Sequence, residues 1–225
     1  MIRHVLHIIS IWIVVLPLVA GLINYRGLNE DSKWIFFLTV VAVPPQVMTY
    51  FFNFTEEKWL NITYNLYTPI EFYLLFFLFK PKYETRGSRL THLSTAFLYA
   101  ALSIFFVVRF DIGKQFISYW VCANNLFYIF WIMLFLKEQY HSDSFLIRKE
   151  NPFAWYILAL IIYAPCTLLI FCLYYYVRDP QHAELMKLWL IQIICNILLY
   201  VFFSVGLFIS KKDRPTPLNE SKQYK

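Results

Sequence analysis

The sequence predicts an all-α polytopic membrane protein, a bundle of seven transmembrane helices, and two observations lead to this fold class. Of the 225 residues, 60% are hydrophobic and 21% are aromatic, whereas only 15% are charged. Such a composition is typical of membrane proteins and not of a soluble domain of this size. The chain also contains seven apolar runs, and about 20 helical residues cross a hydrocarbon core about 30 Å thick. Because these runs do not alternate apolar and polar residues, they exclude a transmembrane β-barrel.

The seven predicted spans follow one another with short connections. The first run is too long for a signal peptide and lacks a cleavage site of small residues, so we expect it to be retained as a span. The fourth run is the shortest. Residues 1–210 therefore form one bundle, and the polar, basic tail of residues 211–225 is expected to be disordered. The predicted spans are Val5–Ile23, Trp34–Phe52, Ile62–Phe79, Leu93–Val108, Phe116–Leu136, Phe153–Val177 and Leu188–Ser210.

Prolines inside four of these spans mark places where a helix is expected to bend. Each proline removes one backbone hydrogen bond and crowds the preceding turn, so a helix kinks there. The prolines are Pro17 in the first span, Pro44 and Pro45 in the second, Pro69 in the third and Pro165 in the sixth.

The distribution of Lys and Arg predicts the orientation of the bundle. Seven spans place alternate connections on opposite sides of the membrane. The side that holds the C-terminal tail carries 14 of the 20 basic residues, and the other side carries the remaining six. Basic loops stay in the cytoplasm, so the N-terminus is predicted outside and the C-terminus in the cytoplasm. The net charge of +6 reflects this asymmetry. It requires no nucleic-acid partner, since the basic tail suits the anionic headgroups of the lipid bilayer.

Polar side chains gather in one half of the predicted spans. In the third, fifth and seventh spans, which run inward, amides and hydroxyls come early and the remainder is apolar. The second span runs outward and carries Gln46 in its later half. Tyr64, Thr68 and Glu71 recur at i, i+4 and i+7, which places them on one helix face. Because lipid-exposed amides are unfavourable, we expect such stripes to face one another and to line a polar cavity near the outer surface.

Glu71 is the residue whose presence most needs a reason. An ionised and unpartnered carboxylate in the middle of a span costs roughly 2.5 kcal/mol or more. We expect Glu71 at the floor of the cavity, as the ion-pair or hydrogen-bond partner of a small ligand. The candidate ligand-binding residues are Glu71, Tyr64, Asn65, Thr68, Gln46, Asn124, Asn125, Gln192 and Asn196.

The alternative interpretation of these residues is structural. Asn, Gln and Thr commonly join membrane helices through hydrogen bonds worth about 0.6 kcal/mol each. A protonated Glu71 bonded to an Asn or a Tyr would join helices in the same way.

No motif in the sequence indicates an enzyme, a metal site or a cofactor. We find no nucleophile elbow, zinc motif or phosphate-binding loop, so no catalytic residue is predicted and no cofactor is expected. The seventh span has no internal lysine that could hold retinal, because Lys187 lies at its mouth. The cysteines all lie inside predicted spans without metal-ligand spacing, and we interpret them as small apolar packing residues. They are Cys122, Cys166, Cys172 and Cys195.

The stretch Asn65-Leu-Tyr-Thr-Pro-Ile-Glu-Phe72, together with the size, the seven spans and the short basic tail, resembles the small stand-alone seven-helix membrane proteins of Bacteroidota. The resemblance covers the whole chain in layout and only this stretch in detail. It implies an integral protein of the bacterial inner (cytoplasmic) membrane with a sensory role, and it assigns no ligand.

The leading functional hypothesis is a membrane sensor or receptor-like protein that binds a small ligand in the outer cavity. Signalling would pass to a separate protein partner at the basic loops Lys80–Arg89 and Lys137–Lys149. The apolar inner half argues against a conduit, because a transporter needs polar lining reachable from both sides. The alternatives are a small-solute or proton-coupled transporter, a structural subunit of a larger membrane complex and, with least support, an enzyme acting on a lipid.

Overall fold

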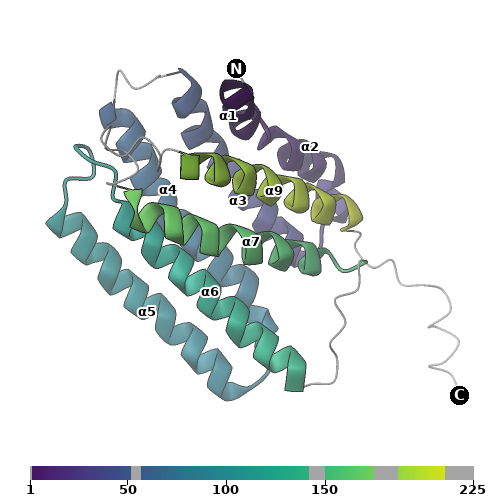
Figure 1. Ribbon diagram of the computed structural model, residues 1–225. Helices are drawn as coiled ribbons and strands as arrows, with labels where there is room; N and C mark the ends of the chain where they lie inside the picture. The colour runs from purple at the N-terminus through teal and green to yellow at the C-terminus, as the bar shows by residue number, and fades with distance from the viewer. Residues whose placement is uncertain (1, 52–56, 142–149, 175–186, 211–225) are drawn as a thin grey trace, which may run out of the picture.

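The described part of the chain is all-helical. The computed structural model describes residues 2–51, 57–141, 150–174 and 187–210, and these contain no strand. Two short 3-10 turns, Tyr25–Gly27 and Lys80–Lys82, follow α2 and α4. The α-helices are α1 (Ile2–Trp12), α2 (Val15–Asn24), α3 (Glu30–Phe51), α4 (Glu57–Phe79), α5 (Arg86–Arg109), α6 (Ser118–His141), α7 (Pro152–Cys172) and α9 (Leu188–Ile209) (Figure 1). The predicted tail, residues 211–225, lies outside the described residues.

Five helical segments of the described chain are long and apolar enough to cross a membrane. They are Val5–Gly27, Arg86–Arg109, Ser118–Tyr140, Pro152–Cys172 and Leu188–Ile209. The prediction of an all-helical protein with membrane-spanning helices is confirmed by the length and composition of these five segments. The second and third predicted spans form α3 and α4, of 22 and 23 residues. Both helices start with charged residues and carry more polar side chains, and neither is among these five segments.

The first predicted span is broken in its middle, between α1 and α2. Pro17 has no backbone N–H, and its ring crowds the carbonyl of Ile13 four residues earlier. The Ile13 carbonyl accepts instead from the backbone N–H of Leu16, at 3.0 Å. By contrast, α3 continues through Pro44 and Pro45, and α4 and α7 continue through their internal prolines.

The fourth span was predicted to be the shortest, and its helix proves to be as long as any in the described chain. Helix α5 has 24 residues. It begins seven residues before the predicted Leu93, because Thr85 caps it: the Thr85 side-chain oxygen accepts from the backbone N–H of Ser88 at 3.3 Å. A capped polar first turn extends a helix beyond its apolar run.

Close contacts between α6, α7, α9 and α2 form the central part of the bundle. Gly206 allows α7 and α9 to approach, because a Cβ atom there would lie 2.2 Å from the Tyr156 ring. Helices α3 and α4 form a second close pair. Helix α5 lies at the edge and packs against α6 and α4 (Figure 1).

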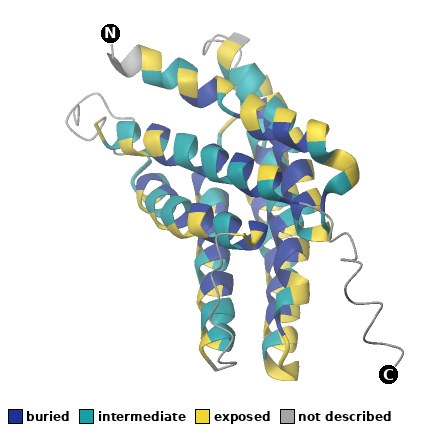
Figure 2. Ribbon diagram, turned by 90° about the vertical axis from the view of Figure 1, so that its right-hand side faces the viewer, coloured by how far each residue is buried: buried dark blue, intermediate teal, exposed yellow. Residues whose placement is uncertain are grey.

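The outer faces of the helices are apolar and exposed (Figure 2). On α5, Phe97 is 72% exposed and Val108 is 81% exposed. The buried residues of the same helix, which include His92 and Tyr99, form one stripe toward α4 and α6. An exterior with so many exposed large apolar side chains is unfavourable in water and suits lipid.

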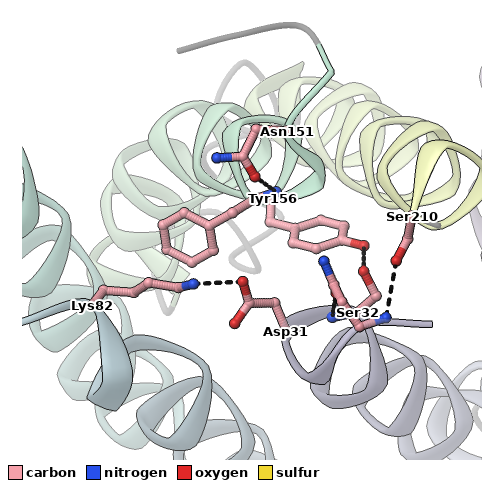
Figure 3. A network of polar contacts seen from close by, with 8 residues as sticks. Asp31, Ser32, Lys82, Asn151, Tyr156 and Ser210 are labelled. Carbon is pink, nitrogen blue, oxygen red and sulfur yellow. Dashed lines mark hydrogen bonds and ion pairs between the residues drawn. The ribbon is translucent and has the colours of Figure 1, made fainter. Parts of the chain in front are cut away.

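A network of polar contacts joins the starts of α3 and α7 to the turn after α4 and the end of α9, at one end of the bundle (Figure 3). The Lys82 ammonium forms an ion pair with Asp31 at 2.5 Å and lies 4.5 Å from the centre of the Phe153 ring. The hydroxyls of Ser32 and Tyr156 are 2.7 Å apart. The same end holds Tyr83, whose hydroxyl donates to the Trp131 carbonyl at 3.0 Å, and burial raises the pKa of that hydroxyl. These contacts close this end of the helix bundle.

An aromatic cluster fills the half of the bundle that follows Glu71 along α4. The Phe72 ring stacks on Tyr99 with centroids 3.5 Å apart, and Trp131 lies 4.9 Å from both Phe72 and His92. His92 is buried here and stacks on Phe76 at 4.3 Å. This histidine is a strongly polar side chain in a region that the sequence indicated as apolar.

Candidate functional site

Glu71 lies inside the bundle with polar neighbours from two helices. Its side chain is half-buried, on the turn of α4 that follows Pro69. The carboxyl group interacts by hydrogen bonding with the side chains of Tyr67, one turn earlier, and Asn124 of α6. Among the described residues, no Lys or Arg forms an ion pair with Glu71.

Phenol groups from several helices lie near this carboxyl. Tyr67 of α4, Tyr128 of α6, Tyr163 of α7 and Tyr200 of α9 all lie within electrostatic range of Glu71. The four hydroxyls therefore come from four different helices, three of which reach this point from distant parts of the sequence. We call Glu71, Asn124 and these four tyrosines the Glu71 site.

Polar side chains from α3, α4, α7 and α9 extend the site. Gln46 hydrogen-bonds to Tyr200, and the hydroxyls of Tyr64 and Thr49 are 2.8 Å apart. Thr167 donates to Gln192 at 3.2 Å. The structure thus brings Gln46, Tyr64, Asn124 and Gln192 of the sequence candidates into one region with Glu71.

Asn124 has a buried acceptor that nothing in the described chain satisfies. Its amide nitrogen donates to the Thr68 carbonyl at 2.7 Å and to the Tyr128 hydroxyl at 3.1 Å. Its amide oxygen accepts no hydrogen bond among the described residues. Leaving such a group unpaired costs about 1–3 kcal/mol. The side chain of Thr68 itself donates to the Tyr64 carbonyl at 2.8 Å, within α4.

Three other sequence candidates bond to groups other than Glu71. Asn125 donates to the Val121 carbonyl of its own helix at 2.8 Å. Asn196 donates to the carbonyl and hydroxyl of Ser10, at 3.1 and 3.0 Å, and so joins α9 to α1. Asn65 is bonded to the loop between α5 and α6.

The Asn65 side chain makes three hydrogen bonds to loop backbone. Its nitrogen donates to the carbonyls of Ile112 and Gln115, both at 2.9 Å, and its oxygen accepts from the Ile117 N–H at 3.0 Å. Asn65 is buried, so these backbone groups depend on it. It positions the loop, and both of its N–H donors are used in these contacts.

We expect Asn65→Ala to lower the free energy of unfolding by about 2–3 kcal/mol, because it leaves buried loop backbone groups unpaired. The measurement is thermal unfolding of the purified protein in detergent. Asn24→Ala is the matched control, since the Asn24 side chain donates only to the Ala20 carbonyl of its own helix, at 3.2 Å. Equal melting temperatures for the two variants would contradict the assigned role of Asn65.

The sequence candidates did not include Tyr163 and Thr167 of α7. These residues lie at i and i+4 on a helix that the sequence indicated only as apolar and proline-containing. Their spacing was the available signal, because it places two hydroxyls on one helix face beside Pro165.

The described residues contain no group of three or more His, Cys, Asp or Glu side chains that could hold a metal ion. Fold and site together define a class: an all-helical integral membrane protein whose bundle contains a carboxyl group near phenols, with no basic partner among the described residues. Comparisons of the chain with protein-family models, with curated proteins and with solved structures found no match.

Proposed function

We propose that this protein is a receptor-like membrane sensor that binds a small organic cation at the Glu71 site. In this proposal all seven predicted segments, α3 and α4 included, cross the inner membrane of a bacterium. The N-terminus lies outside and the C-terminus in the cytoplasm, as the basic loops indicate.

One observation carries the proposal: Glu71 has a half-buried carboxyl group with phenol and amide neighbours and no basic partner in the described chain. A carboxylate within a membrane bundle needs a counter-charge, and such residues generally mark ligand or ion sites. A small organic ammonium would supply that charge. The surrounding tyrosine rings attract cations through their faces, and an N–H of the ligand would satisfy the unpaired oxygen of Asn124.

The opposite half of the bundle favours a receptor over a conduit. Beyond Glu71, the stacked rings of Phe72 and Tyr99 and the adjoining Trp131 ring occupy the interior. The ion pair of Lys82 with Asp31 then joins the turn after α4 to the start of α3 at the end of the bundle. A ligand would therefore act by changing helix contacts, and a partner would read the change at the basic loops. Of the loop 137–149, residues 142–149 lie outside the described residues.

The test is thermal unfolding of the full-length protein in detergent with matched small molecules. The panel holds tetramethylammonium and n-butylammonium chlorides, n-butanol as a neutral analogue, sodium butyrate as an anion, and sodium chloride for ionic strength. We expect only the organic cations to raise the melting temperature, with about 2.7 kcal/mol of stabilisation at a hundred times the dissociation constant. Stabilisation by butanol or butyrate alone, or by none of the panel, would argue against a cation site.

A further inference from the structure

Two cysteines from neighbouring helices have their sulfur atoms in contact. The Sγ atoms of Cys122 and Cys172 are 3.6 Å apart. Cys122 lies in the second turn of α6, and Cys172 is the last residue of α7. The pair therefore lies near the ends of both helices, at the end of the bundle that the orientation rule places outside. A disulfide bond is about 2.05 Å long, so a modest approach of the two sulfurs would close it.

We propose that Cys122 and Cys172 form a thiol–disulfide site, which bridges α6 to α7 when it reacts with a low-molecular-weight disulfide. This modification goes beyond the proposed ligand binding and does not depend on it. The sequence offered no reason to pair these residues, which lie 50 positions apart.

The exposure of the two thiols sets the order of the reaction. Cys172 is exposed and Cys122 is buried. A thiolate is the attacking species, and the sulfur at the surface of the bundle is the one that an oxidant can reach. The Cys172 thiolate attacks one sulfur of the oxidant RSSR, which breaks the RS–SR bond, releases RS⁻ and leaves a mixed disulfide.

Cys122 then completes the bridge from inside the bundle. Its thiol gives up a proton and attacks the Cys172 sulfur, and a second RS⁻ leaves. The two released thiolates take up the two protons lost by the cysteines. In the overall reaction the two cysteines are oxidised by two electrons and RSSR is reduced to two RSH.

The other two cysteines provide a matched control within the same chain. Cys195 of α9 is buried, and its thiol hydrogen-bonds to that of Cys166 in α7. Cys166 lies six residues before Cys172, about 9 Å deeper along the helix at 1.5 Å per residue. The deeper pair is thus adjacent but has no exposed member, so we expect the outer pair to react first.

A bridge at this position would fix two helices that carry the Glu71 site. Asn124 follows Cys122 by two residues on α6, and Thr167 precedes Cys172 by five on α7. Oxidation would therefore restrict the relative movement of Asn124 and Tyr163, which both border Glu71.

The test treats full-length, reduced protein in detergent with oxidised glutathione and follows thiols by alkylation and intact mass. We expect the wild-type protein to lose two hydrogen atoms and to yield a cross-linked peptide joining Cys122 to Cys172. The double variant Cys166→Ser/Cys195→Ser should do the same. Cys122→Ser should stop at a glutathione adduct on Cys172, and Cys172→Ser should keep Cys122 reduced. Glu71→Gln should oxidise like the wild-type protein, which separates this result from ligand binding.

Three outcomes would overturn the proposal. The wild-type protein could stop at the glutathione adduct without closing the bridge. It could bridge Cys166 to Cys195 in preference, or it could keep Cys122 and Cys172 reduced while the denatured chain is oxidised. Size-exclusion chromatography checks that each serine variant remains folded, and a variant that fails is replaced by the corresponding alanine.

Discussion

The Glu71→Gln protein is expected to melt at a higher temperature than the wild-type protein and to lose its stabilisation by organic cations. Glutamine keeps the size of the side chain and one acceptor oxygen for the Tyr67 and Asn124 side chains. It removes a charge that costs roughly 2.5 kcal/mol when unpartnered in a membrane bundle, so we expect a gain of about 1–2 kcal/mol without ligand. Loss of the counter-charge should weaken binding of n-butylammonium at least tenfold, or about 1.4 kcal/mol.

The two expected effects of Glu71→Gln are opposed: the protein without ligand becomes more stable, and binding of the cation becomes weaker. A site that binds its ligand at the expense of stability shows both effects. Thermal unfolding in detergent, with and without n-butylammonium, measures them together. Glu30→Gln is the matched control, since Glu30 is exposed at the start of α3, and it should leave both quantities unchanged. A lower melting temperature for Glu71→Gln would show instead that the carboxyl group joins helices, as in the structural interpretation.

Trp131→Ala is expected to be the most destabilising single substitution, with a loss of about 3–5 kcal/mol. The Trp131 side chain is fully buried, and its ring packs against Phe72 and His92. Its indole N–H donates to the Thr95 hydroxyl at 3.0 Å. Alanine would therefore leave a large cavity between α4, α5 and α6, and would remove one buried hydrogen bond.

The measurement is thermal unfolding together with the fraction of protein that remains monodisperse in detergent. Trp59→Ala is the control, because Trp59 is 54% exposed near the start of α4, and we expect it to change stability little. A Trp131 variant as stable as the Trp59 variant would mean that the aromatic cluster does not hold α5 against the bundle.

The positions of most helices could be predicted from the sequence, and their ends less well. Long apolar runs locate helices because every backbone group in lipid must be bonded internally. The start of α5 was missed because its first turn is polar and depends on the Thr85 cap. The break at Pro17 and the continuity at Pro44 were not distinguishable, because every proline removes the same hydrogen bond, and the neighbouring helices decide how the chain adjusts.

The sequence also indicated which polar residues are unusual inside an apolar span, but not which of them would contact one another in the folded protein. Glu71 and its stripe partner Tyr64 could be found from helical spacing alone. The role of Asn65 could not, since its three bonds reach a loop about 50 residues away. Tyr163 was missed because a tyrosine in an apolar run has no distinguishing feature until its neighbours are known.

Composition and local periodicity by themselves determined that this is a helical membrane protein with one acid inside an apolar segment. Composition and periodicity depend only on which residues are close neighbours along the chain, and this can be read directly from the sequence. The tertiary structure decided what surrounds that acid. Asn124 and Asn125 are adjacent in sequence but point roughly 100° apart on α6; the first contacts Glu71, and the second bonds back to its own helix. Packing against helices that are distant in the sequence sets the rotation of each helix about its axis. This rotation decides which of the two side chains contacts Glu71.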